Sequence, residues 1–303
     1  MSDPGGRPLR LAVVVNPRSG KGRGARAAAT AVAHLRGRGA EVREYGGSSA
    51  GDTRALTAEA LETTPDALVV VGGDGTLSGI VGLLAAASVP VVLVPAGTGN
   101  DLARSLGIPR DDAEAAEAAL SGEDRRLDLG VVESGGTDTP FLTVAALGFD
   151  ARVSDRTNRL RYPKGRLRYY LALVVELIRL RPTPFRIGLD GAEASSRPGT
   201  LIAVGNTESY GGGMPICVGA RADDGLLDVV HVAPLGRLRL IALFPLLLRG
   251  AHLRRAEVTH DRVGSVVVRA PDLVVYADGE RVGAGECRIR VQPAALTMRV
   301  PRG

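Results

Sequence analysis

The residues best suited to chemistry follow an apolar run and form the segment Gly72-Gly73-Asp74-Gly75-Thr76-Leu77-Ser78. Glycines at such a place let backbone N–H groups face an anion, and a helix beginning there adds its positive end. A carboxylate among these glycines would repel phosphate unless a cation lay between them. The pattern therefore predicts a nucleotide phosphate site in which Asp74 is a partner of Mg²⁺.

Two further glycine-containing segments also follow apolar runs. The first is Asn16-Pro17-Arg18-Ser19-Gly20-Lys21, extending to Gly24, and the second is Pro95 to Arg104. Glycines allow close backbone approach to phosphate, and Lys21 adds positive charge, although the first segment is not a Walker A sequence and a solvated basic loop remains the alternative. In the second segment Asn100 or Asp101 has the alternative role of capping a helix.

The elements around these segments alternate between apolar runs and helical patterns. Continuous Val/Leu strands are predicted at 11–15, 67–71 and 89–94, with helices at 24–38, 77–87 and 113–120. Apolar strands separated by helices are typical of a parallel sheet covered on both faces. An α/β domain is therefore expected over residues 8–126, with the three segments at the carboxyl ends of its strands, where such sheets bind ligands.

The remaining residues, 127–303, have a different texture. Short alternating strands separated by Gly, Pro and Asp turns indicate an antiparallel β-sandwich, which an amphipathic helix over 166–181 interrupts. An alternative for the last strand is that it packs on the first domain. The strands are expected at 127–132, 141–146, 185–189, 201–204, 226–232, 265–269, 273–276 and 288–291.

Composition narrows the possible partners. A net charge of +5 and a pI near 9.6 favour an anionic partner, but few aromatic residues accompany the arginines, which argues against nucleic acid. Cys217 and Cys287 are predicted to be buried thiols, and the histidines lack metal-ligand spacing. The start lacks the apolar core of a signal peptide, and the apolar runs at 169–180 and 240–248 are too short or too interrupted to cross a bilayer. A soluble, cytoplasmic protein is expected.

Taken in order, these motifs resemble the diacylglycerol kinase catalytic domain, in its bacterial lipid kinase branch, a family that also resembles NAD kinases in fold. The resemblance runs along nearly the whole chain. It rests on Asn16-Pro17…Ser19-Gly20, Gly72 to Thr76, Pro95…Gly97-Thr98-Gly99-Asn100-Asp101, Leu127-Asp128-Leu129-Gly130, Gly148-Phe149-Asp150, Asn206, Tyr210-Gly211-Gly212-Gly213-Met214, Asp223 to Asp228 and Asp278-Gly279-Glu280.

The resemblance implies a role for each matching residue. Glu280 would be the general base that takes the proton from a lipid hydroxyl, and Asp74 would lie beside the catalytic Mg²⁺, with Asp101 and Asp128 helping through water. ATP would be held by Asn16, Pro17, Arg18, Ser19, Gly20, Gly72, Gly73, Asp74, Gly75, Thr76, Leu77, Ser78, Thr98, Asn100 and Asp101.

A second, structural Mg²⁺ is implied at Asp224, with the backbone carbonyls of Arg221 and Leu226. A turn between strands can bring one carboxylate and carbonyl oxygens onto a hard cation. The alternatives are an ordinary Asp-Gly hairpin at Asp224 and a plain exposed turn at Glu280.

Two departures from the family pattern concern the nucleotide site. Gly79 stands where the family often has Glu, and a nucleotide-contacting Thr near the end of the second strand has no clear counterpart, although Ser48 or Ser49 can substitute. The adenosine side is therefore less defined than the phosphate side.

A lipid substrate requires contact with a membrane, and the segment 152–168 carries seven basic residues against one acid, Asp155. The helix that follows places Tyr169, Leu173, Leu177 and Leu180 near one face, which together with the charge suits anionic lipid headgroups. In the resemblance, Lys164 and Arg104 match positions of membrane or lipid engagement. The alternatives are a solvated charge run and a core helix, and the apolar segment within 238–255 is a rival for the contact.

The sequence thus predicts an ATP-dependent lipid kinase that uses Mg²⁺ and associates peripherally with the inner face of the membrane. Antiparallel edge strands make a homodimer plausible. An NAD kinase-like enzyme and a catalytically silent lipid-binding regulator are the alternatives. Acyl pockets are lined by Leu and Val whatever the headgroup, so the identity of the lipid stays open.

Overall fold

The structure is a computed structural model that describes residues 7–47, 49–160, 162 and 166–302. The chain forms two compact units. The first runs as far as Leu127 and includes the segment that begins at Ala294; the second comprises Asp128–Pro293. Two long strands, β5 (Glu123–Ser134) and β18 (Cys287–Val300), each contribute residues to both units.

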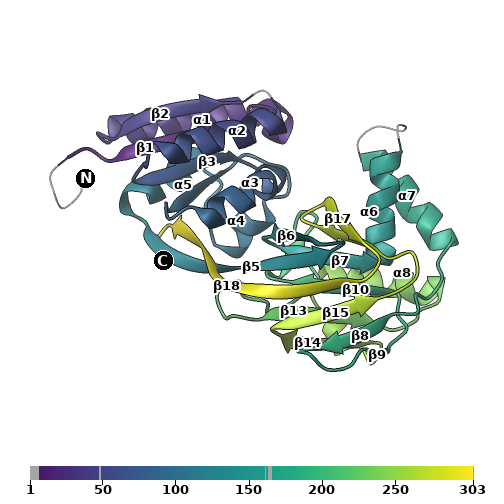
Figure 1. The fold of residues 1–303 in the computed structure, drawn as a ribbon. Coiled ribbons are helices and arrows are strands. Elements are labelled where there is room, and N and C mark those ends of the chain that lie inside the picture. The colour runs from purple at the N-terminus through teal and green to yellow at the C-terminus, as the bar shows by residue number, and fades with distance from the viewer. Residues whose placement is uncertain (1–6, 48, 161, 163–165, 303) are drawn as a thin grey trace. The chain divides into compact units, whose positions relative to one another are not determined.

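The first unit is built on a parallel sheet in the order β2-β1-β3-β4 (Figure 1). Its strands are β1 (Arg10–Val15), β2 (Glu41–Gly46), β3 (Ala67–Gly72) and β4 (Val91–Pro95). Every residue of β3 and β4 is buried, as continuous Val/Leu strands predict. The end of β18 adds to this sheet, where Met298 pairs with Val91 in parallel.

Helices connect these strands. They are α1 (Ser19–Gly37), α2 (Ala50–Glu62), α3 (Asp74–Ala86), α4 (Asp101–Ser105) and α5 (Asp112–Ser121). Helix α1 packs with α5 and α2 packs with α3. Helices α1 and α3 begin earlier than expected, at Ser19 and Asp74, because glycine-rich sequence there continues directly into the first helical turn. The predicted loops are therefore largely helix N-termini.

The second unit contains two facing antiparallel sheets. The six-stranded sheet has the order β14-β13-β10-β7-β16-β17, and β5, β6, β18, β15, β8 and β9 form the other. The bounds are β6 (Thr137–Phe141), β7 (Val144–Gly148), β8 (Arg186–Leu189), β9 (Ser195–Ser196), β10 (Leu201–Gly205), β13 (Leu227–Val232), β14 (Val258–Val263), β15 (Ser265–Arg269), β16 (Val274–Ala277) and β17 (Glu280–Ala284).

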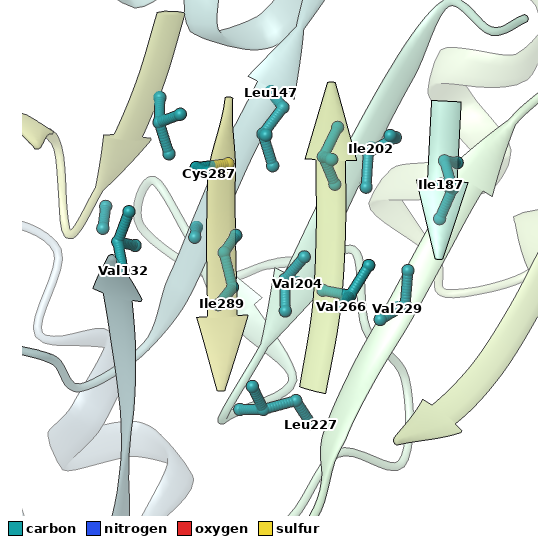
Figure 2. Close-up of a cluster of buried hydrophobic side chains, with 14 of the residues drawn as sticks. Val132, Leu147, Ile187, Ile202, Val204, Leu227, Val229, Val266, Cys287 and Ile289 are labelled. Carbon is teal, nitrogen blue, oxygen red and sulfur yellow. The ribbon is translucent and has the colours of Figure 1, made fainter. Parts of the chain in front are cut away.

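The core of this sandwich is aliphatic. Figure 2 shows Leu147, Ile202 and Val229 of the six-stranded sheet together with Val266 and Ile289 of the other, and all are buried. Each such side chain contributes about 1.5–3 kcal/mol when fully buried. Cys287 lies in the same core and Cys217 in a neighbouring one, both as free buried thiols. The prediction for the cysteines is confirmed.

Three helices and a short two-stranded sheet complete the second unit. The helices are α6 (Phe149–Arg159), α7 (Arg166–Ile178) and α8 (Arg237–Leu248), and the small sheet pairs β11 (Ser209–Tyr210) with β12 (Met214–Pro215). A short 3₁₀ helix, η1, covers His252–Arg254. Across the described ranges, no helix is both long and apolar enough to traverse a bilayer.

The predicted single strand at 141–146 is wrong in one respect. The chain breaks between β6 and β7 at Leu142 and Thr143, whose backbone N–H groups donate to the two carboxylate oxygens of Asp278 at 2.8 and 2.9 Å. The Asp278 side chain, distant in sequence, thus accepts the hydrogen bonds that these N–H groups would donate to a neighbouring strand if the strand were continuous.

Candidate active site

The segments after β1 and β3 meet at Thr76. Its Oγ1 lies 3.3 Å from Nδ2 of Asn16 and 3.1 Å from Oγ of Ser19. The backbone of Asn16 adds a further link, since its N–H donates to the carbonyl of Val71 at 3.2 Å. Two motifs sixty residues apart in the chain therefore form one hydrogen-bonded edge of the first unit.

The segments after β3 and β4 meet through glycine backbone. A Cβ on Gly73 would lie 2.7 Å from Cα of Gly97, and one on Gly72 would lie 2.6 Å from Cβ of Thr76. Similarly, a Cβ on Gly20 would lie 2.1 Å from the carbonyl oxygen of Ala96. These glycines are needed for packing among the segments, a role that their interpretation as points of phosphate approach did not include.

Gly75 is different. A Cβ there would meet no atom within 4 Å, although the residue lies in the first turn of α3. The backbone is open at this point, next to the positive end of the helix dipole. Among the glycines of this motif, Gly75 best suits close approach of an anion.

Helix α1 begins irregularly. Gly20 and Gly22 have φ of 56° and 94°, in the left-handed region that favours glycine. Pro17 and Arg18 precede the helix, and the Arg18 N–H donates to Oδ1 of Asn16 at 3.2 Å. Lys21 belongs to α1, and its side chain lies outside the described residues.

Asp74 is a half-buried carboxylate beside a second one. Burial, and after it the charge of Asp101, raise the pKa of Asp74 above its ordinary value. The Leu102 N–H donates to Oδ1 of Asp74 at 3.4 Å, and Arg104 donates to Oδ1 of Asp101 at 2.8 Å. Two neighbouring carboxylates repel each other, and a divalent cation would relieve that repulsion. The donor set at Asp74 and Asp101 thus fits Mg²⁺.

Asn100 shapes the third segment. It adopts a left-handed backbone with φ of 54°, and its side chain accepts from the N–H of Gly97 at 3.0 Å and donates to the carbonyl of Gly97 at 3.1 Å. Its side chain does not cap α4, so the capping alternative is wrong for this residue. Thr98 lies in the same turn, and its side chain is exposed.

A pocket of ≈ 350 Å³ adjoins this turn within the first unit. Arg23, Arg104 and Arg110 contribute positive charge to it, and its other lining residues are Pro95, Gly97, Thr98, Gly99, Asn100, Ala103, Gly107 and Ile108. Arg23 links the first segment to the third segment and to α5, since its guanidinium donates to the carbonyl of Pro95 at 3.2 Å and to Asp112 at 3.3 Å. Arg23 belongs to the first glycine-containing segment, but no local sequence pattern predicts this contact.

In the second unit, Asp128 and Asp224 share one turn. Oδ2 of Asp128 accepts from the N–H of Gly225 at 2.7 Å, while Oδ1 of Asp224 accepts from the N–H of Leu226 at 3.1 Å. Asp128 was expected to help at the catalytic Mg²⁺; its carboxylate here holds the Asp224-Gly225 turn.

Oδ2 of Asp224 accepts a hydrogen bond from the guanidinium of Arg262, which also lies 3.9 Å from Asp228. The side chain of Arg221 pairs with that of Asp223 at 3.1 Å. The metal donor that the resemblance implies at Arg221 is its backbone carbonyl. Among the described residues, no group of three His, Cys, Asp or Glu side chains could hold a metal ion. A cation at Asp224 therefore has to rely on carbonyls and water and to share the carboxylate with Arg262.

Glu280 is the first residue of β17, directly after a two-residue turn. Asp278 and Gly279 have φ of 49° and 84°, as a type I′ hairpin requires. Because the Asp278 carboxylate is anchored to the break between β6 and β7, the turn is held in place. Glu280 is exposed, and its carboxylate makes no hydrogen bond or ion pair with the rest of the described chain.

Several arginines of the basic segment form ion pairs within the protein. Arg152 and Arg156 both approach the buried carboxylate of Glu176, at 3.8 and 2.5 Å, and Arg159 pairs with Asp155 at 2.8 Å. Glu176 lies beyond the counted stretch, so the charge balance missed it. Lys164 lies outside the described residues.

Of the four residues predicted for the apolar face of the helix that follows, three lie on its core face, whereas Tyr169 is 36% exposed. Leu173, Leu177 and Leu180 pack on buried residues of the second unit. A different face is exposed and carries Leu167, Tyr170, Leu171, Val174 and Ile178.

Of the two serines considered as substitutes for the nucleotide-contacting Thr, Ser49 caps α2, since its Oγ accepts from the N–H of Asp52 at 3.1 Å. Ser48 lies outside the described residues. Gly79 is exposed on α3, and its carbonyl accepts from Arg54 at 3.3 Å.

Family models match both halves of the chain. Residues 10–132 match the diacylglycerol kinase catalytic domain, and residues 143–300 match the YegS C-terminal NAD kinase beta sandwich-like domain. A diacylglycerol kinase of Mycobacterium tuberculosis is 43% identical over 97% of this chain and 96% of its own length.

Solved structures agree on the fold. A diacylglycerol kinase from Bacillus anthracis aligns with a TM-score of 0.71 at 22% identity, covering 97% of this chain and 96% of that one. An NAD kinase from Archaeoglobus fulgidus in complex with ATP aligns with a TM-score of 0.55 at 17% identity, covering 96% and 93%. At these identities the likeness concerns the fold alone, and it includes both kinds of kinase.

Proposed function

Because this chain belongs to the diacylglycerol kinase catalytic-domain family of bacterial lipid kinases, we propose that it transfers the γ-phosphate of ATP to the hydroxyl of diacylglycerol or a related lipid. The family makes it a kinase that phosphorylates an alcohol group. One observation carries the choice of ATP: three segments meet at Thr76 and at the Gly73–Gly97 contact, with open backbone at Gly75.

The triphosphate would lie over the start of α3. There the first-turn N–H groups and the open Gly75 backbone favour an anion, while Asn16 and Ser19 brace Thr76 from one side. Phosphoryl transfer depends mainly on positioning and charge stabilisation, which such a rigid cradle supplies. Arg104, fixed to Asp101 and to the Gly99 carbonyl, adds a cation at the adjoining pocket.

The acceptor hydroxyl needs a group to take its proton. Glu280 suits this role because its carboxylate is exposed, unpaired within the described residues, and presented by a hairpin that Asp278 anchors. We propose it as the general base.

Asp74, with Asp101 beside it, would hold the catalytic Mg²⁺, which neutralises charge on the phosphates when bound. Asp224, with the carbonyls of Arg221 and Leu226, would hold a second, structural Mg²⁺ in competition with Arg262. Both assignments rest on the donor chemistry of the residues and on the family resemblance.

Contact with the lipid surface is supported by exposed apolar side chains on two helices of the second unit. Those on α7 are Leu167, Tyr170, Leu171, Val174 and Ile178, and those on α8 are Leu238, Ile241, Phe244 and Leu248. Arg237, at the start of α8, donates to the carbonyls of Leu177 and Ile178 at 3.1 and 2.6 Å, so the end of α7 is tied to α8.

Exposed apolar surface of this extent is characteristic of a partner or membrane site. We propose that α7 and α8 together rest on the cytoplasmic face of the inner membrane, which unites the two rival segments predicted from sequence. Homodimer formation stays a prediction from the exposed edge strands.

The function is tested by measuring labelled phosphate transfer from ATP to dioctanoylglycerol in mixed micelles, to a panel of other lipid alcohols, and to NAD. Lipid phosphorylation without NADP formation is expected. NADP formation alone would establish the NAD kinase alternative, and nucleotide binding without transfer to any acceptor would establish the silent regulator.

A further inference from the structure

A groove of ≈ 240 Å³ runs beside helix α8 in the second unit, and its lining residues have no role in the proposed reaction. One wall is a stripe of α8 with the helical spacing i, i+3, i+4 and i+7. This stripe consists of Arg239, Ala242, Leu243 and Leu246. The other wall is the segment between η1 and β14, which contributes Arg255 and Glu257.

Two arginines of the groove are available to bind an anion. The side chains of Arg239 and Arg255 are exposed, and neither forms a hydrogen bond or ion pair within the described part of the chain. Arg237 differs, because its guanidinium donates to two carbonyls of α7. A guanidinium presents several N–H donors in a planar arrangement that matches phosphate. Two such groups lining one cavity suit a phosphate group.

Glu257 adds a carboxylate to the same cavity. Its side chain also makes no hydrogen bond or ion pair among the described residues, while its backbone carbonyl accepts from the N–H of Ala233 at 2.8 Å. Because a carboxylate repels phosphate, a ligand held by both arginines should bring a polar hydrogen to Glu257. Two arginines and one glutamate leave one net positive charge, which a singly charged phosphodiester balances.

The rest of the groove is apolar. Leu235 and Leu243 belong to one buried cluster, Leu246 packs against it, and Ala242 is exposed. A ligand held at the arginines therefore has its carbon atoms beside leucines. The groove is smaller than the roughly 300–1,000 Å³ of cavities that enclose a whole drug-sized ligand. Its size suits a headgroup and the first part of an acyl chain.

The groove borders the exposed apolar stripe of α8. Leu238 and Ile241 directly precede the groove residues Arg239 and Ala242, and successive residues of a helix are about 100° apart around its axis. With the exposed stripe on a bilayer, an arginine on its flank reaches the phosphates of the headgroup layer while its carbon stem stays beside the apolar region. A phospholipid can thus enter the groove without leaving the membrane.

We propose that this groove binds an anionic membrane phospholipid with a hydroxyl-bearing headgroup, the chemistry of phosphatidylglycerol. The phosphodiester accepts hydrogen bonds from Arg239 and Arg255, and a headgroup hydroxyl donates to Glu257. The first methylene groups of an acyl chain lie along Leu243 and Leu246. This lipid is a docking partner and not the acceptor of the phosphate, and the inference rests on the membrane contact proposed for α8.

The test titrates the protein, without ATP, with dihexanoyl phospholipids below their micelle concentration, and follows the amide signals of residues 237–257 by NMR. Monomers present no charged surface, so the surface potential of a membrane contributes nothing. Phosphatidylglycerol should bind about tenfold more tightly than phosphatidylmethanol, which has the same charge but no headgroup hydroxyl. It should also bind about tenfold more tightly than glycerophosphoglycerol, since burial of two methylene groups supplies that factor.

Variants assign the contacts to residues. Arg239→Gln and Arg255→Gln should each weaken phosphatidylglycerol binding by about tenfold. Arg249→Gln is the matched control, because Arg249 is an exposed arginine at the C-terminal cap of α8 and does not line the groove. It should change the affinity by less than about twofold. Glu257→Ala should abolish the preference for phosphatidylglycerol over phosphatidylmethanol, an effect that general destabilisation would not produce.

The outcome does not depend on turnover. Binding of the monomers by a protein that phosphorylates no lipid would leave the inference standing and remove the proposed function. Binding of the monomers without binding to vesicles would retain the groove and remove the membrane contact of α8. Equal affinity for phosphatidylglycerol and phosphatidylmethanol would overturn the inference, as would equal losses in Arg255→Gln and Arg249→Gln, glycerophosphoglycerol binding as tight as that of the lipid, or no binding at all.

Discussion

The guanidinium of Arg262 on β14 donates a hydrogen bond to Oδ2 of Asp224, the carboxylate to which the resemblance assigns a structural Mg²⁺. A positive charge is thus already present where a divalent cation is expected. Because both cations would need the same carboxylate, a Mg²⁺ bound at Asp224 would compete with the arginine.

Removing Arg262 should therefore make the second unit more responsive to Mg²⁺. In the absence of nucleotide, Arg262→Met is expected to gain a rise in Tm with Mg²⁺ that exceeds the wild-type rise. Binding at ten times Kd is worth about 1.4 kcal/mol, which corresponds to roughly 2–6 °C for a protein of this size. Arg288→Met, on an exposed arginine of the same unit, is the control. An identical Mg²⁺ response in all three proteins would mean that Arg262 and Mg²⁺ do not compete for Asp224.

Substitutions at Gly73 and Gly75 should distinguish a glycine needed for packing from one needed for phosphate binding. Gly73→Ala forces a methyl group to within 2.7 Å of Cα of Gly97, so it is expected to destabilise the first unit by about 1–3 kcal/mol. Gly75→Ala meets open space and should not lower stability, since alanine also favours helix. Thermal unfolding measures the stability of both variants. Because its methyl group would occupy the open backbone, Gly75→Ala is expected to bind ATP more weakly, which titration measures. Undiminished ATP affinity in Gly75→Ala would argue against phosphate lying over the start of α3.

Asp74→Asn should raise stability at neutral pH in metal-free solution, because it removes a buried charge that Asp101 repels. The pKa of Asp74 is raised in the folded state, so the folded protein holds the proton more tightly than the unfolded chain. Stability conferred by this residue therefore falls as pH rises through the raised pKa. The advantage of the variant should shrink as pH is lowered toward the unfolded value of 3.8. Unfolding midpoints across this range, with and without Mg²⁺-ATP, measure it, and a constant difference would contradict the assignment.

Glu280→Gln should lower kcat by roughly 10²–10⁴-fold, the usual contribution of a general base, without changing ATP affinity. Glutamine keeps the shape of the side chain, and Glu280 is exposed, so the fold should be unaffected. Glu193→Gln, at another exposed glutamate of the second unit, is the control for any general charge effect. A kcat near that of wild type would remove Glu280 from the mechanism.

Polar substitutions on α8 should weaken binding to vesicles without harming the fold. Leu238 is 83% exposed and Ile241 is 53% exposed, so replacing both with Ser costs little core packing. Co-sedimentation with anionic phospholipid vesicles should fall several-fold, since each buried CH₂ is worth about 0.8 kcal/mol. Arg288→Ser, at an exposed residue outside α8, controls for the effect of a surface substitution by Ser. Equal sedimentation of the double variant and wild type would place the membrane contact elsewhere.

Local sequence was enough to predict the parallel sheet, the antiparallel sandwich and the position of the three glycine-containing segments. Apolar runs such as Ala67–Gly72, rich in Val and separated by helical patterns, are typical of strands buried on both faces, and in this chain the glycines that follow lead into the next helix. Periodicity and turn chemistry act over a few residues, so they can be read directly from the chain. The family resemblance rests on the same short motifs.

Tertiary structure alone decided how distant residues use one another. Helix α7 is apolar on two faces, and only its packing distinguishes Leu173, which lies against the core, from Val174, which is 50% exposed. The links from Arg262 to Asp224 and from Arg152 to Glu176 join segments with no periodic relation. Such contacts depend on the three-dimensional path of the chain, because hydrogen bonds and ion pairs form between neighbours in space rather than in sequence.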